Sequence, residues 1–283
     1  MNRKMNEKKR KLAIVASGGG MTCAYSAGAI TAFVEKFKLK KPDIIIGGSG
    51  SIGTLAYYVA KQYKSIKNVW LNLLCNKNVI DIKRLWRVID VDYVIDNIFK
   101  KQEKLNVKKL VKSEIKLFIG VTDYERGKVE YFSNKSKINL FEAIRASMAV
   151  PMLYNKPVRI NNRDYCDSFA SCSVQAGIRK AISLGAKEII AVNTQKDMSW
   201  EEDGFKVWLF AKSKEFKINF QKEIDKIQSF KLPNGIKLVL IEPKERLKIG
   251  FLKNTKKMLR ATFNRGYRET EKNKELLDFL SKK

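Results

Sequence analysis

The sequence predicts an α/β fold with a mostly parallel central sheet, and two observations support this prediction. First, a short apolar run, a Gly-rich turn and a helical pattern follow one another twice, in residues 11–39 and in residues 43–64. Second, the apolar runs are continuous and do not alternate with polar residues, which is typical of parallel strands buried on both faces. Helices that connect such strands build α/β folds, so the same order is expected further along the chain.

Hydrophobic periodicity divides the first half of the chain into strands and helices. The expected strands are 11–17, 43–46, 116–123 and 128–133, and the last of them alternates and pairs with its neighbour. The expected helices are 22–39, 51–64 and 140–149, and Pro151 stops the last one. Residues 65–115 carry amphipathic helical patterns without a strand signal, so we interpret them as a helical insertion or cap.

The second half continues the same alternation. Two short strands are expected around a polar turn at Asn161-Asn162, and a helix over 173–185 precedes a buried strand at 187–194. The remaining expected elements are a helical segment at 202–230, a strand at 237–243 and a basic terminal helix at 252–281. We expect a single domain over 11–283 after a basic N-terminal extension at 1–10, with a basic C-terminal portion at 200–283.

The net charge of +28 predicts attraction to a polyanion. Lys residues are spread along the chain and do not cluster with aromatic residues, so a nucleic-acid platform is unlikely. Peripheral contact with an anionic membrane and simple compositional drift both remain open as explanations. No apolar run approaches the roughly 18–20 residues that span a bilayer, and the first run is too short for a secretory signal.

Cysteine and histidine usage narrows the chemistry. The four cysteines are few and scattered and form no CxxC motif, so we expect reduced thiols in a cytoplasmic protein, without a zinc site. The chain contains no histidine. A Ser-His-Asp or Cys-His mechanism within the chain is therefore excluded. A nucleophilic serine would have to be activated by a carboxylate or a lysine.

The turn "GGSGS" at residues 47–51 has the character of a nucleophile elbow. A serine on a sharp strand-to-helix turn exposes its hydroxyl above the end of the strand, and small neighbours permit the tight reversal. One reading centres on Ser49, with Ser51 in the last Gly position of G-x-S-x-G, and a second reading centres on Ser51. A plain turn or an anion-binding loop would also fit this cluster.

The turn at Gly18-Gly19-Gly20 also joins a strand to a helix, and its amides are unobstructed by side chains. Consecutive amides of this kind can hold a developing oxyanion, and a phosphate cradle is the alternative. A Walker loop is excluded because no G-K-[ST] follows. A dinucleotide site is excluded because the G-x-G-x-x-G spacing fails and no acidic residue follows the second strand.

"SGGGMTCAYSAG", "GGSGS", "ASMAVP" and "YCDS" occur in an order and spacing that resembles the patatin-like phospholipases, over roughly residues 11–195. The resemblance implies a three-layer α/β/α acyl hydrolase with a Ser-Asp dyad, and places Ser49 at its nucleophile and Asp167 at its base. It also implies an oxyanion hole and an elbow, which correspond to Gly18, Gly19 and Gly20 and to Gly47, Gly48, Gly50 and Ser51.

Two departures from the family pattern leave a second function open. Thr22 stands where the family usually has Arg, and Ser168 replaces the Gly that follows the catalytic Asp. A catalytically weak or inactive lipid-binding protein on the same fold is therefore the alternative. Asp167 has an alternative as well, as a helix N-cap or turn residue. As a base it would need a partly apolar site, which Tyr165, Cys166 and Phe169 could supply.

The expected function is that of a phospholipase or lysophospholipase that cleaves carboxylic esters through an acyl-enzyme, with a phospholipid or another acyl ester as substrate. No metal or organic cofactor is expected. We expect the protein to be cytoplasmic, with a peripheral membrane association as one option.

Overall fold

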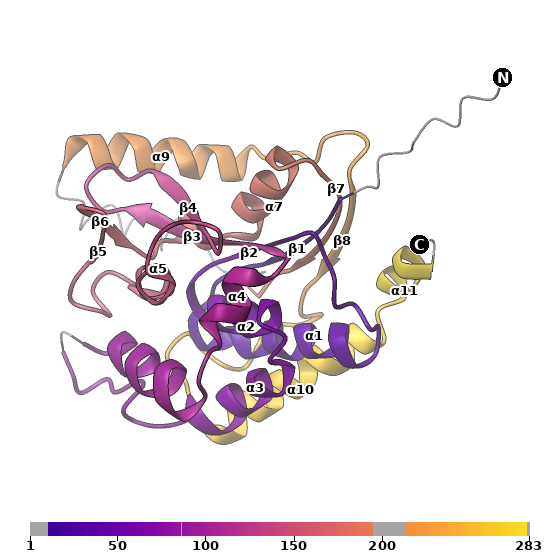
Figure 1. Ribbon diagram of the computed structural model, residues 1–283, viewed down its shortest axis with the longest axis horizontal. Coiled ribbons are helices and arrows are strands. Elements are labelled where there is room, and N and C mark those ends of the chain that lie inside the picture. Colours follow the sequence, from indigo (N-terminus) through magenta and orange to yellow (C-terminus); the bar gives the residue numbers. More distant parts are fainter. Residues whose placement is uncertain (1–10, 86, 195–212, 282–283) are drawn as a thin grey trace.

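A mixed eight-stranded sheet forms the centre of the protein (Figure 1), in a computed structural model that describes residues 11–85, 87–194 and 213–281. The strands lie in the order β5-β6-β3-β2-β1-β7-β8, and β4 pairs with β3. Their bounds are β1 Lys11–Ala16, β2 Ile44–Gly47, β3 Lys116–Asp123, β4 Val129–Ser133, β5 Val158–Ile160, β6 Arg163–Cys166, β7 Ala186–Val192 and β8 Lys237–Ile241. The five neighbouring strands β3, β2, β1, β7 and β8 run parallel, whereas β4 and β6 are antiparallel to β3.

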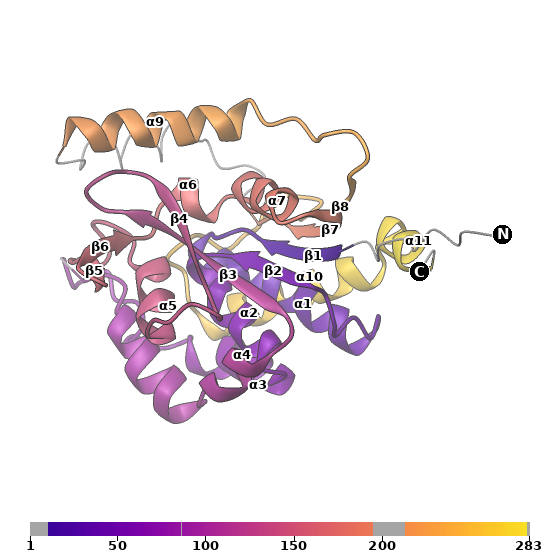
Figure 2. The same ribbon diagram turned by 45° about the horizontal axis from the view of Figure 1, so that its top comes forward.

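Helices cover both faces of the sheet, so the three-layer α/β/α prediction is confirmed (Figure 2). The helices of one side are α1 Ala24–Glu35, α2 Ile52–Val59, α3 Tyr63–Asn68, α4 Val107–Lys112, α5 Leu140–Met148 and α10 Lys256–Glu271. Those of the other side are α6 Phe169–Cys172, α7 Val174–Ser183 and α9 Lys214–Gln228. The short α11 (Lys274–Ser281) lies near the β8 edge.

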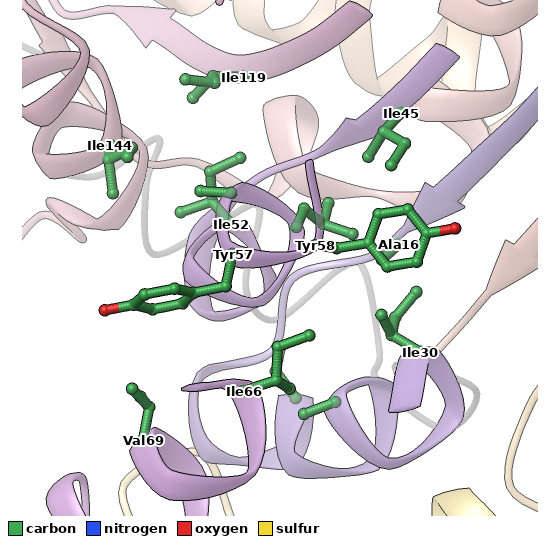
Figure 3. Packing of buried hydrophobic residues seen from close by; sticks show 14 of the residues in the cluster. Ala16, Ile30, Ile45, Ile52, Tyr57, Tyr58, Ile66, Val69, Ile119 and Ile144 are labelled. Atoms are coloured by element: carbon green, nitrogen blue, oxygen red, sulfur yellow. The ribbon is translucent and has the colours of Figure 1, made fainter. Parts of the chain in front are cut away.

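Each central strand contributes side chains to a hydrophobic core on either face of the sheet, because successive side chains point to opposite faces. In β1, Ile14 belongs to the large cluster on the α1 and α2 side, whereas Ala13 and Val15 pack against α7. Figure 3 shows the large cluster, in which Ile45 of β2 and Ile52 of α2 lie between the strands and the helices. This two-sided burial explains why the strands are continuous apolar runs.

The C-terminal helix α10 is an integral part of the core because it packs along α1. A Cβ on Gly28 would lie 2.0 Å from the Phe263 carbonyl oxygen, and one on Gly266 would lie 2.1 Å from the Tyr25 carbonyl oxygen. Glycine at both positions therefore lets the two backbones touch. The single terminal helix expected at 252–281 is wrong: the chain forms α10 and α11, which are separated at residues 272–273.

The region 65–115 is helical only in part. It contains the end of α3, two π-helices (η3 Val69–Leu73 and η4 Tyr93–Gln102) and α4. Residues 74–85 and 87–90 form loops with an isolated antiparallel bridge between Ile80 and Ile89. Among the described residues, no helix combines the length and apolar character needed to cross a bilayer. The expected extension at 1–10, Trp86 and the first part of the basic C-terminal portion, through residue 212, lie outside the described residues.

Candidate active site

Ser49 lies at the carboxyl end of β2, on a 3₁₀ turn (η2, Ser49–Ser51) that leads directly into α2. Its backbone φ is +54°, in the left-handed region that residues with a side chain rarely adopt. The Ser49 N–H donates to Ser147 Oγ at 3.0 Å, and the Ser147 hydroxyl donates to the Gly120 carbonyl at 2.7 Å. These bonds tie the turn to α5 and β3 and hold Ser49 in the strained conformation.

Ser51 has a different environment from Ser49, although the two serines are two residues apart. The Ser51 hydroxyl donates to the Gly48 carbonyl at 2.8 Å and lies 3.3 Å from the Ala16 carbonyl. It is fully buried. The Ser51 side chain therefore closes the turn against β1, whereas Ser49 lines a pocket. The glycines of the turn allow close approach, since a Cβ on Gly50 would lie 2.5 Å from the Gly20 carbonyl oxygen.

Asp167 follows β6 and is brought to the same end of the sheet as Ser49. Its N–H donates to the Ala149 carbonyl at 3.0 Å, and its side chain is only 3% exposed. Burial raises the pKa of Asp167 to about 7, although hydrogen bonding from the Ser49 side chain, the Ser168 backbone and the Cys172 thiol works in the opposite direction. Among the described residues, Asp167 Oδ1 has no hydrogen-bond partner. The carboxylate is thus desolvated and next to Ser49.

Ser168 occupies the position after Asp167 without backbone strain. Its φ of −147° is ordinary extended backbone, so no glycine is required there. Its side chain caps α6 by accepting from the Ser171 N–H at 3.3 Å, and the Ser168 and Thr122 hydroxyls lie 2.6 Å apart. The N-cap in this turn is thus Ser168 and not Asp167.

The glycine turn that follows β1 lies against the Ser49 turn. A Cβ on Gly18 would lie 2.7 Å from Ser49 Cβ. The Gly18 N–H donates to the Cys172 carbonyl at 2.7 Å, so this amide is already occupied. For the N–H groups of Gly19 and Gly20, the described part of the chain supplies no hydrogen-bond acceptor.

Two threonines hold the carbonyls of this glycine turn. Thr194 Oγ1 donates to the Gly18 carbonyl at 2.8 Å, and Thr22 Oγ1 donates to the Gly19 carbonyl at 2.7 Å. A trans peptide directs its C=O and N–H in opposite directions, and the described chain contains no cis peptide. Fixing these two carbonyls therefore fixes the directions of the Gly19 and Gly20 amides.

An apolar pocket lies beside Ser49. Its polar floor is formed by Gly20, Ser49 and Gly50. Its walls come largely from the region 65–115, through Val69, Trp70, Leu74, Val79, Ile89, Val91, Val94 and Phe99, with Met148, Val150 and Phe251 from elsewhere. In the described ranges, no three His, Cys, Asp or Glu side chains lie close enough together to hold a metal ion.

Comparison with known proteins identifies the family. Residues 14–168, more than half of the chain, match the patatin-like phospholipases. The chain belongs to the patatin-like phospholipase family. A curated relative, the uncharacterized protein YjjU of Escherichia coli K12, is 22% identical over 189 residues, which are 65% of this chain and 52% of YjjU. The patatin-like chain thus spans about half the length of that relative.

Solved structures resemble this patatin-like chain in fold. VipD from Legionella pneumophila has a TM-score of 0.54 at 13% identity, over 96% of this chain and 67% of VipD. The type III effector protein ExoU has a TM-score of 0.43 at 10% identity, over 96% of this chain and 53% of ExoU. The likeness to VipD shows a shared fold.

Several residues around Ser49 were missed by sequence reasoning. Ser147 lies within the quoted "ASMAVP" segment, yet nothing in a helical pattern reveals that its hydroxyl supports a distant turn. Thr194 follows a buried strand and looks like an ordinary strand end. Cys172 contributes its carbonyl and its thiol, and a lone cysteine carries no positional signal. The walls of the pocket were missed as well, because the apolar pattern of residues 65–115 indicates which residues are buried but not that they face Ser49.

Proposed function

We propose that this protein is a lipid acyl hydrolase that cleaves carboxylic esters of phospholipids with Ser49 as nucleophile and Asp167 as general base. One observation carries the proposal: Ser49, held at a strained φ, interacts with a buried carboxylate and borders an apolar pocket. Strain of this kind persists where the surrounding structure enforces it, which is common at functional sites.

Asp167 can act as a base in this environment because its pKa lies near neutral pH. Burial raises the pKa of Asp167 to about 7, so the carboxylate binds a proton far more readily than an exposed Asp does. It accepts the Ser49 proton while Ser49 Oγ attacks the ester carbonyl carbon. The same proton then passes to the departing alcohol oxygen, which leaves the acyl group on Ser49. A water molecule, deprotonated by Asp167, attacks the acyl carbon of this acyl-enzyme. The acyl–Oγ bond then breaks, Asp167 returns the proton to Ser49 Oγ, and a fatty acid is released.

The Gly19 and Gly20 amides are the proposed oxyanion donors. A well-placed donor contributes about 3–4 kcal/mol to the stabilisation of the transition state. The Gly18 N–H stays bonded to the Cys172 carbonyl and anchors the turn, so we assign it a supporting role. Thr22, which stands where the family usually has Arg, and Thr194 position the two donor amides through the carbonyls that they bind.

The apolar pocket is the proposed site for an acyl chain. Its floor includes Ser49, while its walls are aliphatic and aromatic, so a chain inside it places the ester beside the nucleophile. Each methylene group that leaves water contributes about 0.8 kcal/mol, which favours long acyl chains over short ones.

A fluorophosphonate probe and a phospholipid hydrolysis panel test this proposal. Wild-type protein should be labelled, Ser49→Ala should not, and Ser51→Ala should keep its labelling at reduced thermal stability, because the Ser51 hydroxyl bonds to backbone carbonyls. Absence of labelling in folded wild-type protein would support a lipid-binding protein without catalysis. Labelling that requires Ser51 and not Ser49 would reverse the assignment of the nucleophile.

A further inference from the structure

The three most exposed large apolar side chains in the described part of the protein all lie on two loops. Leu85 is 77% exposed, Ile82 is 72% exposed and Met152 is 52% exposed, and no other large apolar side chain exceeds 48%. Ile82 and Leu85 lie in the loop that connects η3 to η4, and Met152 lies in the turn between α5 and β5. Exposed apolar side chains that carry no function are usually scattered singly over a protein surface, whereas these three lie on two loops.

The two loops are joined to each other and to the core. The Ile89 N–H donates to the Leu153 carbonyl at 2.9 Å, so the first loop lies beside the second. Asp92 at the end of the first loop accepts from the Tyr154 hydroxyl at 2.8 Å and forms an ion pair with Arg145 of α5. Figure 1 shows both loops together at the left end of the molecule. We call residues 81–85 and 150–156 the apolar tip.

The same loops line the apolar pocket with their inward residues. Val79 and Ile89 flank the first part of the tip, and Val150 belongs to the second part; all three line the pocket next to Ser49. Met152 has a φ of +71°, in a turn that directs its side chain to the surface two residues after Val150. The same two loops therefore supply apolar residues to the wall of the pocket and to the outer surface of the tip.

Charge at the tip is compatible with an anionic surface. Asp90 pairs with Arg84, and Asp92 pairs with Arg145, so these two flanking acids are neutralised. Asp81, within the tip, accepts from the Lys83 N–H at 3.0 Å. Lys83 is exposed between the two apolar side chains and has no carboxylate partner in the described ranges. Lys156 lies 3.6 Å from Asp92, and its side chain is 59% exposed. The net charge of +28 adds long-range attraction to anionic lipids.

We infer that the apolar tip is the surface by which this protein docks on an anionic phospholipid bilayer. Ile82, Leu85 and Met152 insert among the acyl chains, and Lys83 and Lys156 contact the anionic head groups. The choice of a bilayer as the occupant rests on the proposed function, because a hydrolase of long-chain phospholipids meets its substrate in a bilayer. Docking at the tip places the apolar walls of the pocket against the bilayer, so an acyl chain reaches Ser49 along an apolar path.

Co-sedimentation with vesicles of phosphatidylcholine and phosphatidylglycerol tests the docking surface. The variants are Ile82→Asp/Leu85→Asp at the tip and Ile218→Asp/Leu277→Asp as a control at other exposed apolar positions. Both pairs change the net charge equally. We expect the tip variant to lose about tenfold or more in vesicle affinity, whereas the control changes less than twofold. Ile82→Ala/Leu85→Ala, without added charge, should give a smaller loss of the same kind, and thermal melts check that each variant is folded.

Two further measurements separate this inference from the proposed function. Ser49→Ala should bind vesicles as well as wild type, since docking needs no catalysis; this result stands even if no hydrolysis is found. Hydrolysis of a soluble short-chain ester should be unchanged in the tip variant, while hydrolysis of vesicles falls. Equal losses in the tip and control variants would overturn the inference. A wild-type dimer that the tip variant converts to a monomer, with vesicle binding intact, would assign the tip to a second copy instead.

Discussion

The two Gly-rich turns of this protein place different residues at nearly the same backbone φ. Gly20 in the first turn has a φ of +57°, and Ser49 in the second turn has a φ of +54°. At Gly20 two factors oppose a side chain. The φ is unfavourable for a residue with a Cβ, and the Phe251 carbonyl oxygen would lie 2.6 Å from that Cβ. At Ser49 the chain keeps a side chain at a cost on the order of 1 kcal/mol. The strain at Ser49 thus indicates a functional role for its side chain, whereas glycine at position 20 fits the local backbone and leaves room for Phe251.

The partners of the two turns differ in a complementary way. In the first turn the carbonyls of Gly18 and Gly19 are held by threonine hydroxyls, which leaves the next amides available. In the second turn the Ser49 amide is held by Ser147, and the Ser49 hydroxyl interacts with Asp167. One turn therefore presents backbone donors and the other presents a side chain, although both have the same strand–turn–helix origin.

Removal of the Asp167 carboxylate should have the largest effect on catalytic activity. Asp167→Asn should lower kcat/KM for ester hydrolysis by about 10²–10⁴-fold, the usual contribution of a general base. Wild-type kcat/KM should rise with pH and level off above an apparent pKa of about 7, because Asp167 must be ionised to accept the Ser49 proton. The variant should lack this rise. A wild-type profile that is flat from pH 5 to 8 would contradict the role of Asp167.

The same substitution should stabilise the fold at alkaline pH. Burial raises the pKa of Asp167 above its usual 3.8, so the folded state binds this proton more tightly than the unfolded state does. The resulting stability is complete below about pH 4 and is lost as pH rises through 7. Asp167→Asn should avoid this loss and gain up to about 4 kcal/mol at pH 8 relative to wild type, as measured by denaturant unfolding.

Substitutions at the two residues of positive φ should show that alanine is less stable than glycine at both positions 20 and 49. Gly20→Ala should destabilise the protein by about 2–3 kcal/mol, from strain plus the overlap with Phe251. Gly235→Ala is the matched control, since Gly235 has a φ of +80° and open space around it, and should cost only about 1 kcal/mol. Ser49→Gly should be more stable than Ser49→Ala by about 0.5–1 kcal/mol. Equal stability of the two Ser49 variants would show that the second turn is unstrained.

The smallest expected effect on activity concerns Thr22. Thr22→Val keeps the shape of the side chain but removes the hydroxyl bond to the Gly19 carbonyl, which then keeps only the Thr22 N–H donor at 3.2 Å. The direction of the Gly20 amide is therefore held less firmly. We expect kcat to fall about tenfold with little change in KM, since the lost interaction acts on the transition state. Thr22→Ser should restore activity. Thr31→Val, which removes a buried hydroxyl within α1, is the control and should leave kcat unchanged.

Much of the fold could be predicted because burial on both faces marks parallel strands in the sequence. The strands at Lys11–Ala16 and Lys116–Asp123 and the helix at Leu140–Met148 lie within two residues of their expected bounds. The break between α10 and α11 and the loops at residues 74–85 and 87–90 could not be predicted in this way. Their conformations depend on packing against α1 and on ion pairs such as that between Asp92 and Arg145, which join residues far apart in the chain.

The sequence by itself determined which chemistry is available. It supplied no histidine, two Gly-rich turns after buried strands and an Asp close to a family motif, and these features depend only on residue type and spacing. Only the tertiary structure decided which amides, hydroxyls and carboxylates are engaged by other hydrogen-bond partners and which are available for that chemistry. It bound the Gly18 amide to the Cys172 carbonyl, turned the Ser51 hydroxyl into the backbone and buried Asp167 beside Ser49. Hydrogen-bond partners and desolvation arise from contacts between distant segments, which no local pattern encodes.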